Sequence, residues 1–588
     1  MKIMICTIPI RPVPTDYPPF GAMAVIQSLR EEGHDPVFFD IDGLRPSMSE
    51  ILERFQEEKP DVLGISAVVS TAYGYVKELC LKLRTILPDL QIILGGNLAA
   101  SPEILLRICS VDVCVAGDGE VIIKNLAAYY AQNHAEPDYS ELEQIKGISY
   151  LDPNGEMVFT GVEQSTSAGD VLSPDFSILE EYSEIENFIA DPLARQDFSQ
   201  DSRSYEPHRA GKKMALVLFS KGCVARCTFC HRWEKGFRQL PPEKVIAQIS
   251  SIMERYNVGF IQFGDENFGS DRKATEELLR LIKPLDILWQ VSGVRAGSVD
   301  LELLKRMRDA GCVALYYGFE TGSPDILKVM EKKLELSHSL DTARAMHQAG
   351  LFTIYQLVLG MPGENPRTIS ETIEMVKNVT EFLPLNPFHY LSINYIQALP
   401  GTPVYEYARS TGRIGSQLED EEKYLLSISD VNAHDDSKFI NYTSYPYLVV
   451  RSWRLRIRFA AMTHWAKMNR SRDRVDMGRA ITHEGNKNLA YEKGGYFNLA
   501  GMRIPLVVLR FLEPIEWLPV WAWTIATEYW RSPTKVFFSR LWELIVAKFK
   551  KIDETSVDYI SLRKTMRTLA AAPTTKTEES MVPFRLGR

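Results

Sequence analysis

Short apolar runs alternate with amphipathic segments along the first 135 residues of the chain. A helical period of apolar positions, as in residues 22–32 and 75–87, predicts helices between the runs. Five runs predict buried strands, at residues 2–8, 37–40, 61–66, 91–96 and 111–116. Alternating strands and helices form a doubly wound, Rossmann-like parallel sheet, and ligands of such sheets bind beyond the carboxyl ends of the strands. The residues expected there are Ser66, Gly95, Gly96 and Gly117.

Glycines at strand ends have a second interpretation. They permit tight turns between a strand and the following helix. The two interpretations are compatible, because the same missing side chain lets a large ligand approach the backbone.

A second series of apolar runs, between residues 213 and 415, predicts six further strands separated by helices such as 242–256 and 301–310. This repeat predicts a partial (βα)6 TIM-type barrel, with its chemistry at the carboxyl ends of the strands. The expected strands are residues 214–219, 260–263, 287–292, 314–320, 352–360 and 391–397.

The remaining segments are a connector and a C-terminal region. Residues 136–212 hold a hairpin around a Pro153–Gly155 turn and a polar linker. Residues 416–588 are predicted to be mainly helical, with disorder after about residue 570. The predicted architecture is therefore α/β, with domains at 1–135 and 213–415.

Composition narrows the class of protein. A chain of 588 residues implies several domains, and a net charge of −9 gives no reason to expect nucleic-acid binding. The eight cysteines are too few and too irregular for a secreted disulfide framework, and the N-terminus does not read as a signal peptide. We expect a cytoplasmic protein.

The segment Ser220–Cys230 holds three cysteines, Cys223, Cys227 and Cys230, in a CxxxCxxC spacing. Three thiolates on one loop can hold three irons of a [4Fe–4S] cluster and leave the fourth iron open to a small molecule. No fourth cysteine follows nearby, since the next is Cys312. A zinc site would need a fourth ligand, and His231 is adjacent to Cys230, where chelation is strained. Three buried structural cysteines are the alternative.

This loop resembles the signature of the radical S-adenosylmethionine (SAM) enzymes. The resemblance implies that the open iron chelates SAM and that an electron from the cluster cleaves SAM to a 5′-deoxyadenosyl radical. Gly264, Asp265 and Glu266 follow the second barrel strand, where the family hydrogen-bonds the amino group of SAM. A polar turn that caps the next helix is the alternative for these residues.

Other strand ends of the core carry further matches. Gly318–Gly322 resembles a GFExG pattern of cobalamin-linked family members, which makes Glu320 a candidate catalytic residue at the barrel mouth, for SAM ribose or substrate. The turn after Gly360 resembles the family's GxPGE turn, which makes Gly360 a candidate SAM contact. Ser292 and Arg295, at the end of the third strand, are further candidates for cofactor binding.

The first 135 residues are similar to the cobalamin-binding domain of class B radical SAM enzymes. The similarity rests on the Gly95-Gly96 turn and on Gly117–Glu120. The family's cobalt-ligating histidine is missing, because the corresponding segment Asp40–Arg45 has none. A degenerate domain that binds nothing is the alternative to a cobalamin site.

The resemblance implies a cobalamin-dependent radical SAM methyltransferase that acts on an unactivated carbon of a small-molecule or lipid-like substrate, with flavodoxin or ferredoxin as electron donor. Two alternatives stay open: a cyclase or oxidase of the magnesium-porphyrin cyclase type, and a cobalamin-binding sensor with a vestigial core. The intact cysteines argue against the sensor. The apolar, tryptophan-rich stretch at residues 504–530 and the helix at 537–551 suggest either peripheral membrane contact or a helical cap on the barrel.

Overall fold

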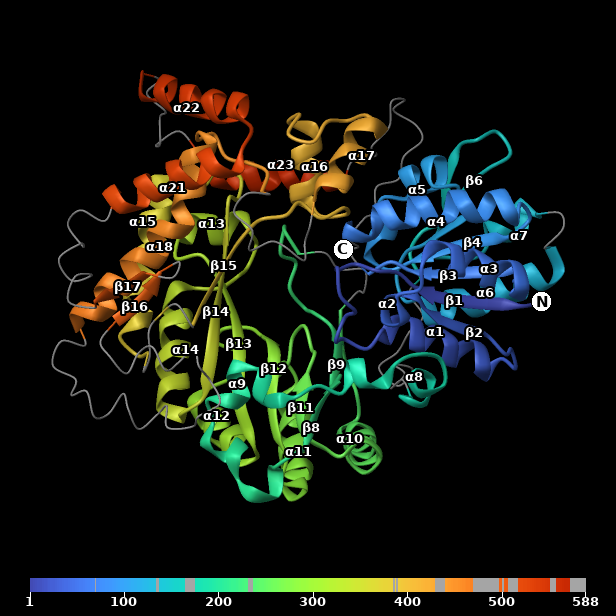
Figure 1. Cartoon of the computed structure of the whole chain (residues 1–588), viewed down its shortest axis with the longest axis horizontal. Helices are drawn as coiled ribbons and strands as arrows, with labels where there is room; N and C mark the ends of the chain where they lie inside the picture. The colour runs from blue at the N-terminus through green and yellow to red at the C-terminus, as the bar shows by residue number, and fades with distance from the viewer. Residues whose placement is uncertain are drawn as a thin grey trace.

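The computed structural model describes residues 1–68, 70–133, 137–163, 175–230, 236–383, 387, 390–428, 439–468, 496–499, 502–505, 517–549 and 557–571. His231 and the tail expected to be disordered lie outside these residues, the tail from residue 572 onward. Two sheets lie side by side, one from the N-terminal part of the chain and one from its middle, as Figure 1 shows.

The N-terminal sheet has the strand order β2-β1-β3-β4-β5-β6-β7. Its first five strands are parallel, which confirms the predicted doubly wound sheet. They are β1 (Ile3–Thr7), β2 (Val37–Asp40), β3 (Val62–Ser66), β4 (Gln91–Gly95) and β5 (Val113–Val115).

Helices cover both faces of this sheet. Alternate residues of β1 face opposite layers, because successive side chains of a strand point to opposite sides. Ile3 and Ile5 pack with α1 (Phe20–Glu31) and α6 (Gly119–Asn133), whereas Met4 and Cys6 pack with helices on the other face. That second layer contains α3 (Met48–Glu58), α4 (Tyr73–Ile86) and α5 (Pro102–Ile108).

The predicted connector divides its residues between the two sheets. Its hairpin, β6 (Ile148–Leu151) and β7 (Met157–Phe159), extends the N-terminal sheet by pairing antiparallel with β5. Farther along, α9 (Gln196–Ser199) plugs the amino-terminal end of the barrel, where Phe198 packs edge-on against Phe260 at 5.2 Å between ring centroids.

The second sheet has the order β15-β14-β13-β12-β11-β8, and all neighbours are parallel. Consecutive strands are therefore adjacent, and the sheet forms the predicted open half-barrel. The strands are β8 (Lys213–Val217), β11 (Val258–Phe263), β12 (Leu288–Val294), β13 (Cys312–Glu320), β14 (Phe352–Leu359) and β15 (Leu391–Tyr395). The helices between them include α10 (Pro242–Tyr256), α11 (Arg272–Ile282), α12 (Leu301–Asp309), α13 (Pro324–Val329), α14 (Leu336–Ala349) and α15 (Pro366–Thr380).

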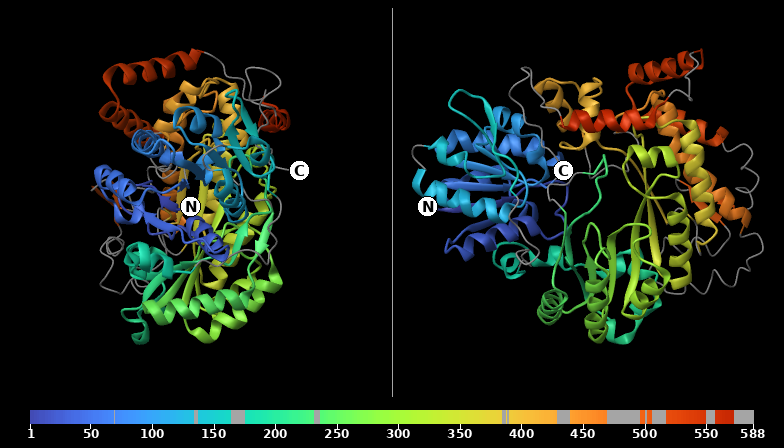
Figure 2. Two further views of the ribbon diagram at one scale, coloured as in Figure 1. Left: turned by 90° about the vertical axis from the view of Figure 1, so that its right-hand side faces the viewer. Right: turned by 180° about the vertical axis from the view of Figure 1, so that it is seen from behind.

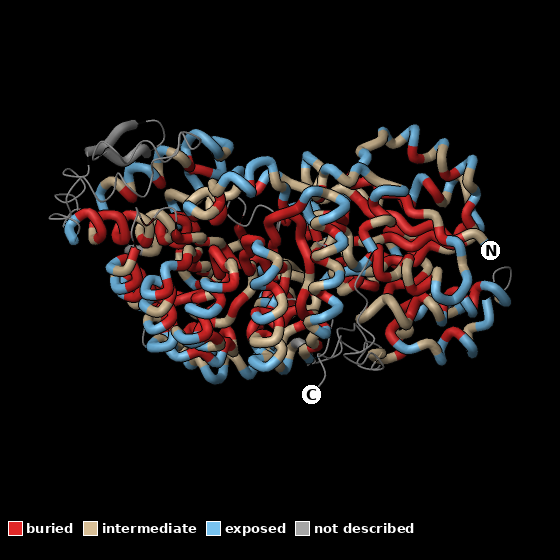
Figure 3. The backbone as a smooth tube through the Cα atoms, turned by 90° about the horizontal axis from the view of Figure 1, so that it is seen from below, coloured by how far each residue is buried: buried red, intermediate tan, exposed pale blue. Residues whose placement is uncertain are grey.

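The two faces of the half-barrel differ in burial. Outward side chains such as Trp289, Tyr317 and Tyr355 are buried beneath the helices, whereas alternate inward residues of β13, β14 and β15 are half-buried. Figure 3 shows both sheets as buried layers under more exposed helices. Truncation of a buried aromatic such as Trp289 to alanine would cost about 3–5 kcal/mol.

The C-terminal helices cover the core from outside. α18 (Tyr447–Met468) packs on α15, and its buried Arg451 forms an ion pair with Glu528 of α21 (Trp517–Arg531). α23 (Tyr559–Ala571) lies across α13 and α16 (Pro403–Ser410), as the rear view in Figure 2 shows. The other helices here are α17 (Leu418–Ser427) and α22 (Thr534–Phe549). Within the described ranges, no helix is long and apolar enough to cross a membrane.

Candidate active site

A cavity of about 370 Å³ lies where the carboxyl ends of the two sheets meet. The N-terminal domain contributes all four predicted strand-end residues, and the core contributes Gly264 and Glu266, which were predicted to contact SAM. The cavity thus brings two predicted sites together. Its lining includes Ser66, Gly95, Gly96, Gly117, Asp118, Glu120, Leu218, Ser220, Lys221, Gly264 and Glu266.

The glycines of this lining have two separate roles. A Cβ atom added at Gly95 or Gly117 would meet nothing within 4 Å, so these backbones face open space. At Gly96 (φ +88°), a Cβ would lie 2.5 Å from the carbonyl oxygen of Ala67, so this position needs glycine for its turn. The N-terminal wall of the cavity is an open backbone cradle, which suits a large, flat ligand such as a corrin ring.

The segment that corresponds to the cobalt-ligating loop is held by hydrogen bonds within the protein. The Asp40 carboxylate accepts hydrogen bonds from Thr7, from the backbone N–H of Gly43 and from Ser183. Neither this segment nor any histidine appears in the described lining of the cavity. The residues present therefore offer a corrin a surface but no imidazole ligand.

The cysteine loop follows β9 (Ser220–Gly222), which pairs with β10 (Phe237–Gln239) to form a hairpin. Thr228 anchors the loop across the barrel mouth, because its N–H donates to Met330 O at 2.9 Å and its carbonyl accepts from Val404 N at 3.2 Å. Cys227 is buried, Cys223 is half-buried and Cys230 is exposed. The described thiols share one loop but do not converge to metal-binding distance.

Cationic groups surround the Cys227 thiol. Burial raises the pKa of Cys227, while Lys332 and Arg295 act in the opposite direction and favour its thiolate. Lys332 is itself buried and donates to Glu320 Oε1 at 2.6 Å. Three thiols on one loop, with two cationic groups near Cys227, are a donor set that suits an iron–sulfur cluster.

Glu320 and Arg295 lie outside the cavity lining. Glu320 (φ +60°) is 7% exposed and is occupied by its ion pair with Lys332. The Arg295 guanidinium donates to the carbonyl oxygens of Lys332 and Lys333. Glu320 and Arg295 thus both contact the segment around Lys332, and their contacts keep that segment close to Cys227. Lys332 was missed, because nothing in its local sequence marks it.

Asp265 stabilises the start of the cysteine loop through hydrogen bonds to Phe219 and Ser220. Its buried carboxylate accepts from the backbone N–H of Phe219 at 3.1 Å and from the Ser220 hydroxyl. Burial raises its pKa to about 7, against the effect of these hydrogen bonds. Asp265 therefore faces the loop, whereas its neighbours Gly264 and Glu266 face the cavity.

Gly360 lies in a turn that is stabilised by a hydrogen bond between two of its own residues, Gly360 and Glu364. Its φ is +86°, and its N–H donates to Glu364 Oε2 at 2.5 Å. Burial raises the pKa of Glu364 to about 8. Gly360 is not part of the cavity lining, so its assignment to SAM stays a prediction.

The barrel interior carries polar side chains that sequence reasoning missed. Gln262 donates to Ser292 Oγ at 2.9 Å and lies 3.4 Å from the Tyr17 hydroxyl, which the N-terminal domain contributes. Gln290, beside Gln262 on the next strand, is fully buried, and neither of its amide atoms has a hydrogen-bond partner in the described chain. Tyr316 donates to Asp197 of α9 at 3.0 Å. Polar residues at alternate positions of the strands were the sequence feature from which a polar barrel interior could have been predicted.

Helix α23 holds the cysteine loop from outside the barrel. The Arg567 guanidinium donates to the carbonyl oxygen of Arg226, which lies within the CxxxC segment, and to Glu331 Oε2 at 3.0 Å. Sequence alone gave no sign of this contact, because 341 positions separate Arg567 and Arg226.

Comparisons with known proteins agree with this architecture. A sequence model of the radical SAM superfamily matches residues 217–376, and a model of the B12-binding domain matches residues 7–127. The chain is 27% identical over 422 residues to an uncharacterized methyltransferase of Pyrococcus horikoshii, with 69% of this chain and 83% of that protein covered. It is 28% identical over 373 residues to the anaerobic magnesium-protoporphyrin IX monomethyl ester cyclase of Cereibacter sphaeroides, with 61% of this chain covered. That match spans little more than half of the cyclase, 56%.

A solved structure shares the whole architecture. The cobalamin-dependent S-adenosylmethionine radical enzyme OxsB with aqua-cobalamin bound matches with a TM-score of 0.60 at 16% identity, over 97% of this chain and 83% of that chain. At this identity the match shows the fold. Together, the two domain matches place this chain in the radical SAM superfamily, among the members with a B12-binding domain. It is a radical SAM enzyme, and a [4Fe–4S] cluster, SAM and cobalamin are its cofactors.

Proposed function

We propose that this enzyme transfers a methyl group to an unactivated carbon of a small-molecule or lipid-like substrate. The observation that carries the proposal is that one cavity is lined both by the glycine cradle of the N-terminal sheet and by the strand ends next to the cysteine loop. When bound, the cluster supplies the electron that cleaves SAM, and cobalamin supplies the methyl group. A shared cavity suits methyl transfer because both cofactors must reach the same substrate carbon.

The proposal assigns roles to the predicted residues. Cys223, Cys227 and Cys230 hold the cluster, while Gly264, Glu266 and Ser292 face SAM. The strand-end residues Ser66, Gly95, Gly96 and Gly117 face cobalamin. Glu320 and Arg295 act as positioning residues through Lys332, and Asp265 positions the start of the cysteine loop.

Cyclisation or oxidation is the second candidate. The match to the magnesium-protoporphyrin cyclase favours it, since that relative is as similar to this chain as the methyltransferase is. Both reactions need one-electron reduction, so we propose an electron donor such as flavodoxin or ferredoxin, inside the cytoplasm.

The test is product stoichiometry in the reconstituted enzyme. The holoenzyme, supplied with SAM, a reductant and polar or lipid extracts, should form S-adenosylhomocysteine and 5′-deoxyadenosine in equal amounts together with a methylated product. 5′-Deoxyadenosine without S-adenosylhomocysteine would contradict methyl transfer and favour the cyclase reaction.

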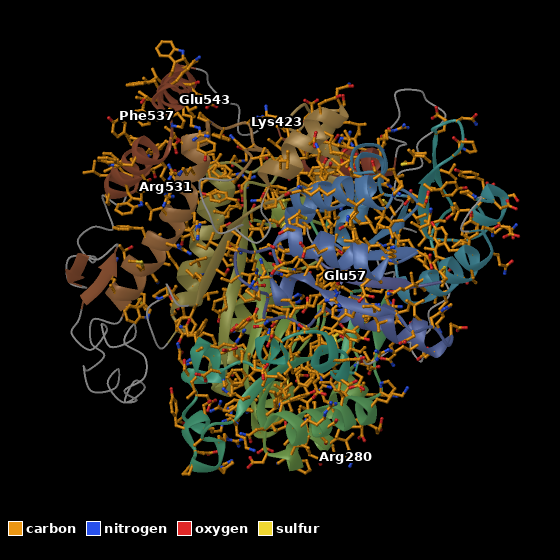
Figure 4. All side chains as sticks on the ribbon, turned by 45° about the vertical axis from the view of Figure 1, so that its right-hand side comes forward. Glu57, Arg280, Lys423, Arg531, Phe537 and Glu543 are labelled. Atoms are coloured by element: carbon orange, nitrogen blue, oxygen red, sulfur yellow. The ribbon has the colours of Figure 1, made fainter. Side chains whose placement is uncertain are left out.

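We also propose peripheral contact with a membrane through α21 and α22. These helices expose several large aromatic side chains, among them Trp530 at 82% and Trp542 at 66% of their surface. Figure 4 shows the two helices at one corner of the molecule, where Arg531, Phe537 and Glu543 are labelled. Exposed tryptophan and tyrosine next to basic residues such as Arg531 and Lys535 suit the interface of an anionic bilayer.

Vesicle sedimentation tests the membrane contact. The full chain should sediment with vesicles of phosphatidylcholine and phosphatidylglycerol, and the double substitution Trp530→Ser/Trp542→Ser should abolish this. Substitution of Val13 and Leu193 by serine is the matched control, because these exposed apolar residues lie elsewhere. Equal sedimentation of both variants would contradict the proposal.

A further inference from the structure

We propose that the Gly117–Glu120 turn is a latch between the two domains, in which Asp118 and Glu120 bind the hairpin that leads into the cysteine loop. The sequence marked this turn as a strand end near a ligand and as part of the similarity to a cobalamin-binding domain. The structure shows that its two carboxylates reach the other domain. Lys221 lies 2.7 Å from Asp118 Oδ1 and 2.8 Å from Glu120 Oε1. Arg238 pairs with the second oxygen of Asp118.

The four side chains form a compact, neutral group. Two carboxylates face two cations, and exposure is between 9% and 22% for each side chain. Burial works to raise the pKa of Asp118, but Arg238 and Lys221 lower it to about 2. Asp118 is therefore ionised throughout the neutral range.

Burying four charges is a poor way to gain stability, because desolvation offsets most of the attraction between them. Such groups do impose one geometry, since any displacement leaves a buried charge without its partner. We infer that this latch serves position more than stability. A neutral apolar contact at the same place would allow the domains to slide.

The position of the latch indicates what it controls. Asp118 and Glu120 flank Gly119 in the cavity wall, directly after Gly117 of the glycine cradle. Lys221 stands two residues before Cys223, and Arg238 lies on the paired strand β10. The latch therefore ties the end of the cradle to the base of the cysteine loop, and fixes the gap between the two cofactor sites. In this respect it rests on the proposed function, with Asp118 as a positioning residue.

Hydrogen–deuterium exchange of the anaerobic holoenzyme tests the latch. Asp118→Asn should speed amide exchange in residues 220–222 and 237–239 by at least about tenfold, because local opening of a held segment governs its exchange. The ratio of methylated product to 5′-deoxyadenosine should fall, with iron content unchanged. The conservative variant Asp118→Glu keeps a carboxylate between Lys221 and Arg238, so it should retain slow exchange.

A second interdomain pair provides the matched control. Lys77 of α4 lies 2.5 Å from Glu422 of α17, away from the hairpin. Glu422→Gln should leave exchange of the hairpin at the wild-type rate. Unchanged exchange in Asp118→Asn, or exchange in Asp118→Glu as fast as in Asp118→Asn, would overturn the latch. If the wild-type enzyme forms no methylated product, only the proposed function is contradicted. The exchange measurement still tests the latch.

Discussion

The two carboxyl edges that meet at the cavity are built in opposite ways. The N-terminal edge presents glycine backbone to open space at Gly95 and Gly117. The core edge has side chains behind the cavity wall that hydrogen bonds hold in place, such as Asp265 at the start of the cysteine loop and Lys332 beside Cys227. A wall with exposed backbone at these two glycines selects a ligand mainly by shape, whereas a fixed set of side-chain donors selects it by the groups that it can bind. The two edges should therefore fail in different ways.

The largest loss of activity should come from a substitution at the core edge, in the cysteine loop. Cys227→Ala removes one of the three proposed cluster ligands, so 5′-deoxyadenosine formation should fall about 1,000-fold or more while cobalamin still binds. Iron content and quantified 5′-deoxyadenosine measure this. Cys312→Ala is the control, since this buried cysteine lies on β13 outside the loop. A Cys227→Ala protein with normal iron content would be incompatible with the assignment.

A substitution at the cradle should separate the two cofactors. Gly95→Leu places a side chain in the open space of the cavity, so cobalamin affinity should fall about 100-fold by steric exclusion, since the open pocket depends on the missing Cβ. Visible spectroscopy during cobalamin titration gives the affinity, and iron content should not change. Gly96→Ala offers a contrast, because its clash with Ala67 O should lower the unfolding temperature. Tight cobalamin binding by Gly95→Leu would show that the corrin lies elsewhere.

The support of the cysteine loop should have an intermediate effect. Arg567→Ala removes the contacts to Arg226 O and Glu331, so a chelator should extract iron about tenfold faster, in the range seen for outer-sphere partners of metal ligands. Arg567→Lys should restore part of the protection. Lys564→Ala, at an exposed position of the same helix, should leave the rate unchanged. Equal rates in all variants would remove α23 from the description of the site.

The smallest effect concerns the turn after β14. Since burial raises the pKa of Glu364 from 4.5 to about 8, the folded protein keeps a proton that the unfolded chain has released. The stability contributed by Glu364 is complete below pH 4.5 and is lost as the pH rises through 8. Glu364→Gln keeps an acceptor for Gly360 N–H and cannot ionise. At each pH we compare the unfolding free energy of the variant with that of the wild type. This difference, variant minus wild type, should be about 1–4 kcal/mol larger at pH 8 than at pH 5. Denaturant unfolding at both pH values measures this, and parallel pH profiles would contradict it.

The sequence was sufficient for the strands of both sheets, because a buried strand needs only a local apolar run between turns. It also located the cavity, since strand ends of parallel sheets are local features that gather at one edge. The side-chain roles were harder to predict. Glu320 and Arg295 were expected to face a ligand, but both are occupied at Lys332, a partner that no local pattern indicates.

Contacts between distant segments were beyond sequence reasoning for the same reason. The latch joins Asp118 to Lys221 and Arg238, and the polar interior joins Tyr17 to Gln262. Each such pair depends on how two separately folded units are placed. A single sequence records the residues of these pairs but not their partners.

The contact between α23 and the cysteine loop also has a consequence for biosynthesis. Arg567 is translated 341 residues after Arg226. At roughly 5–20 residues per second, a ribosome needs about 20–70 s to cover that distance. For that interval the nascent chain carries its three cysteines without the helix that later restrains them, so iron and sulfide delivered during synthesis meet a loop that is still open to the assembly machinery.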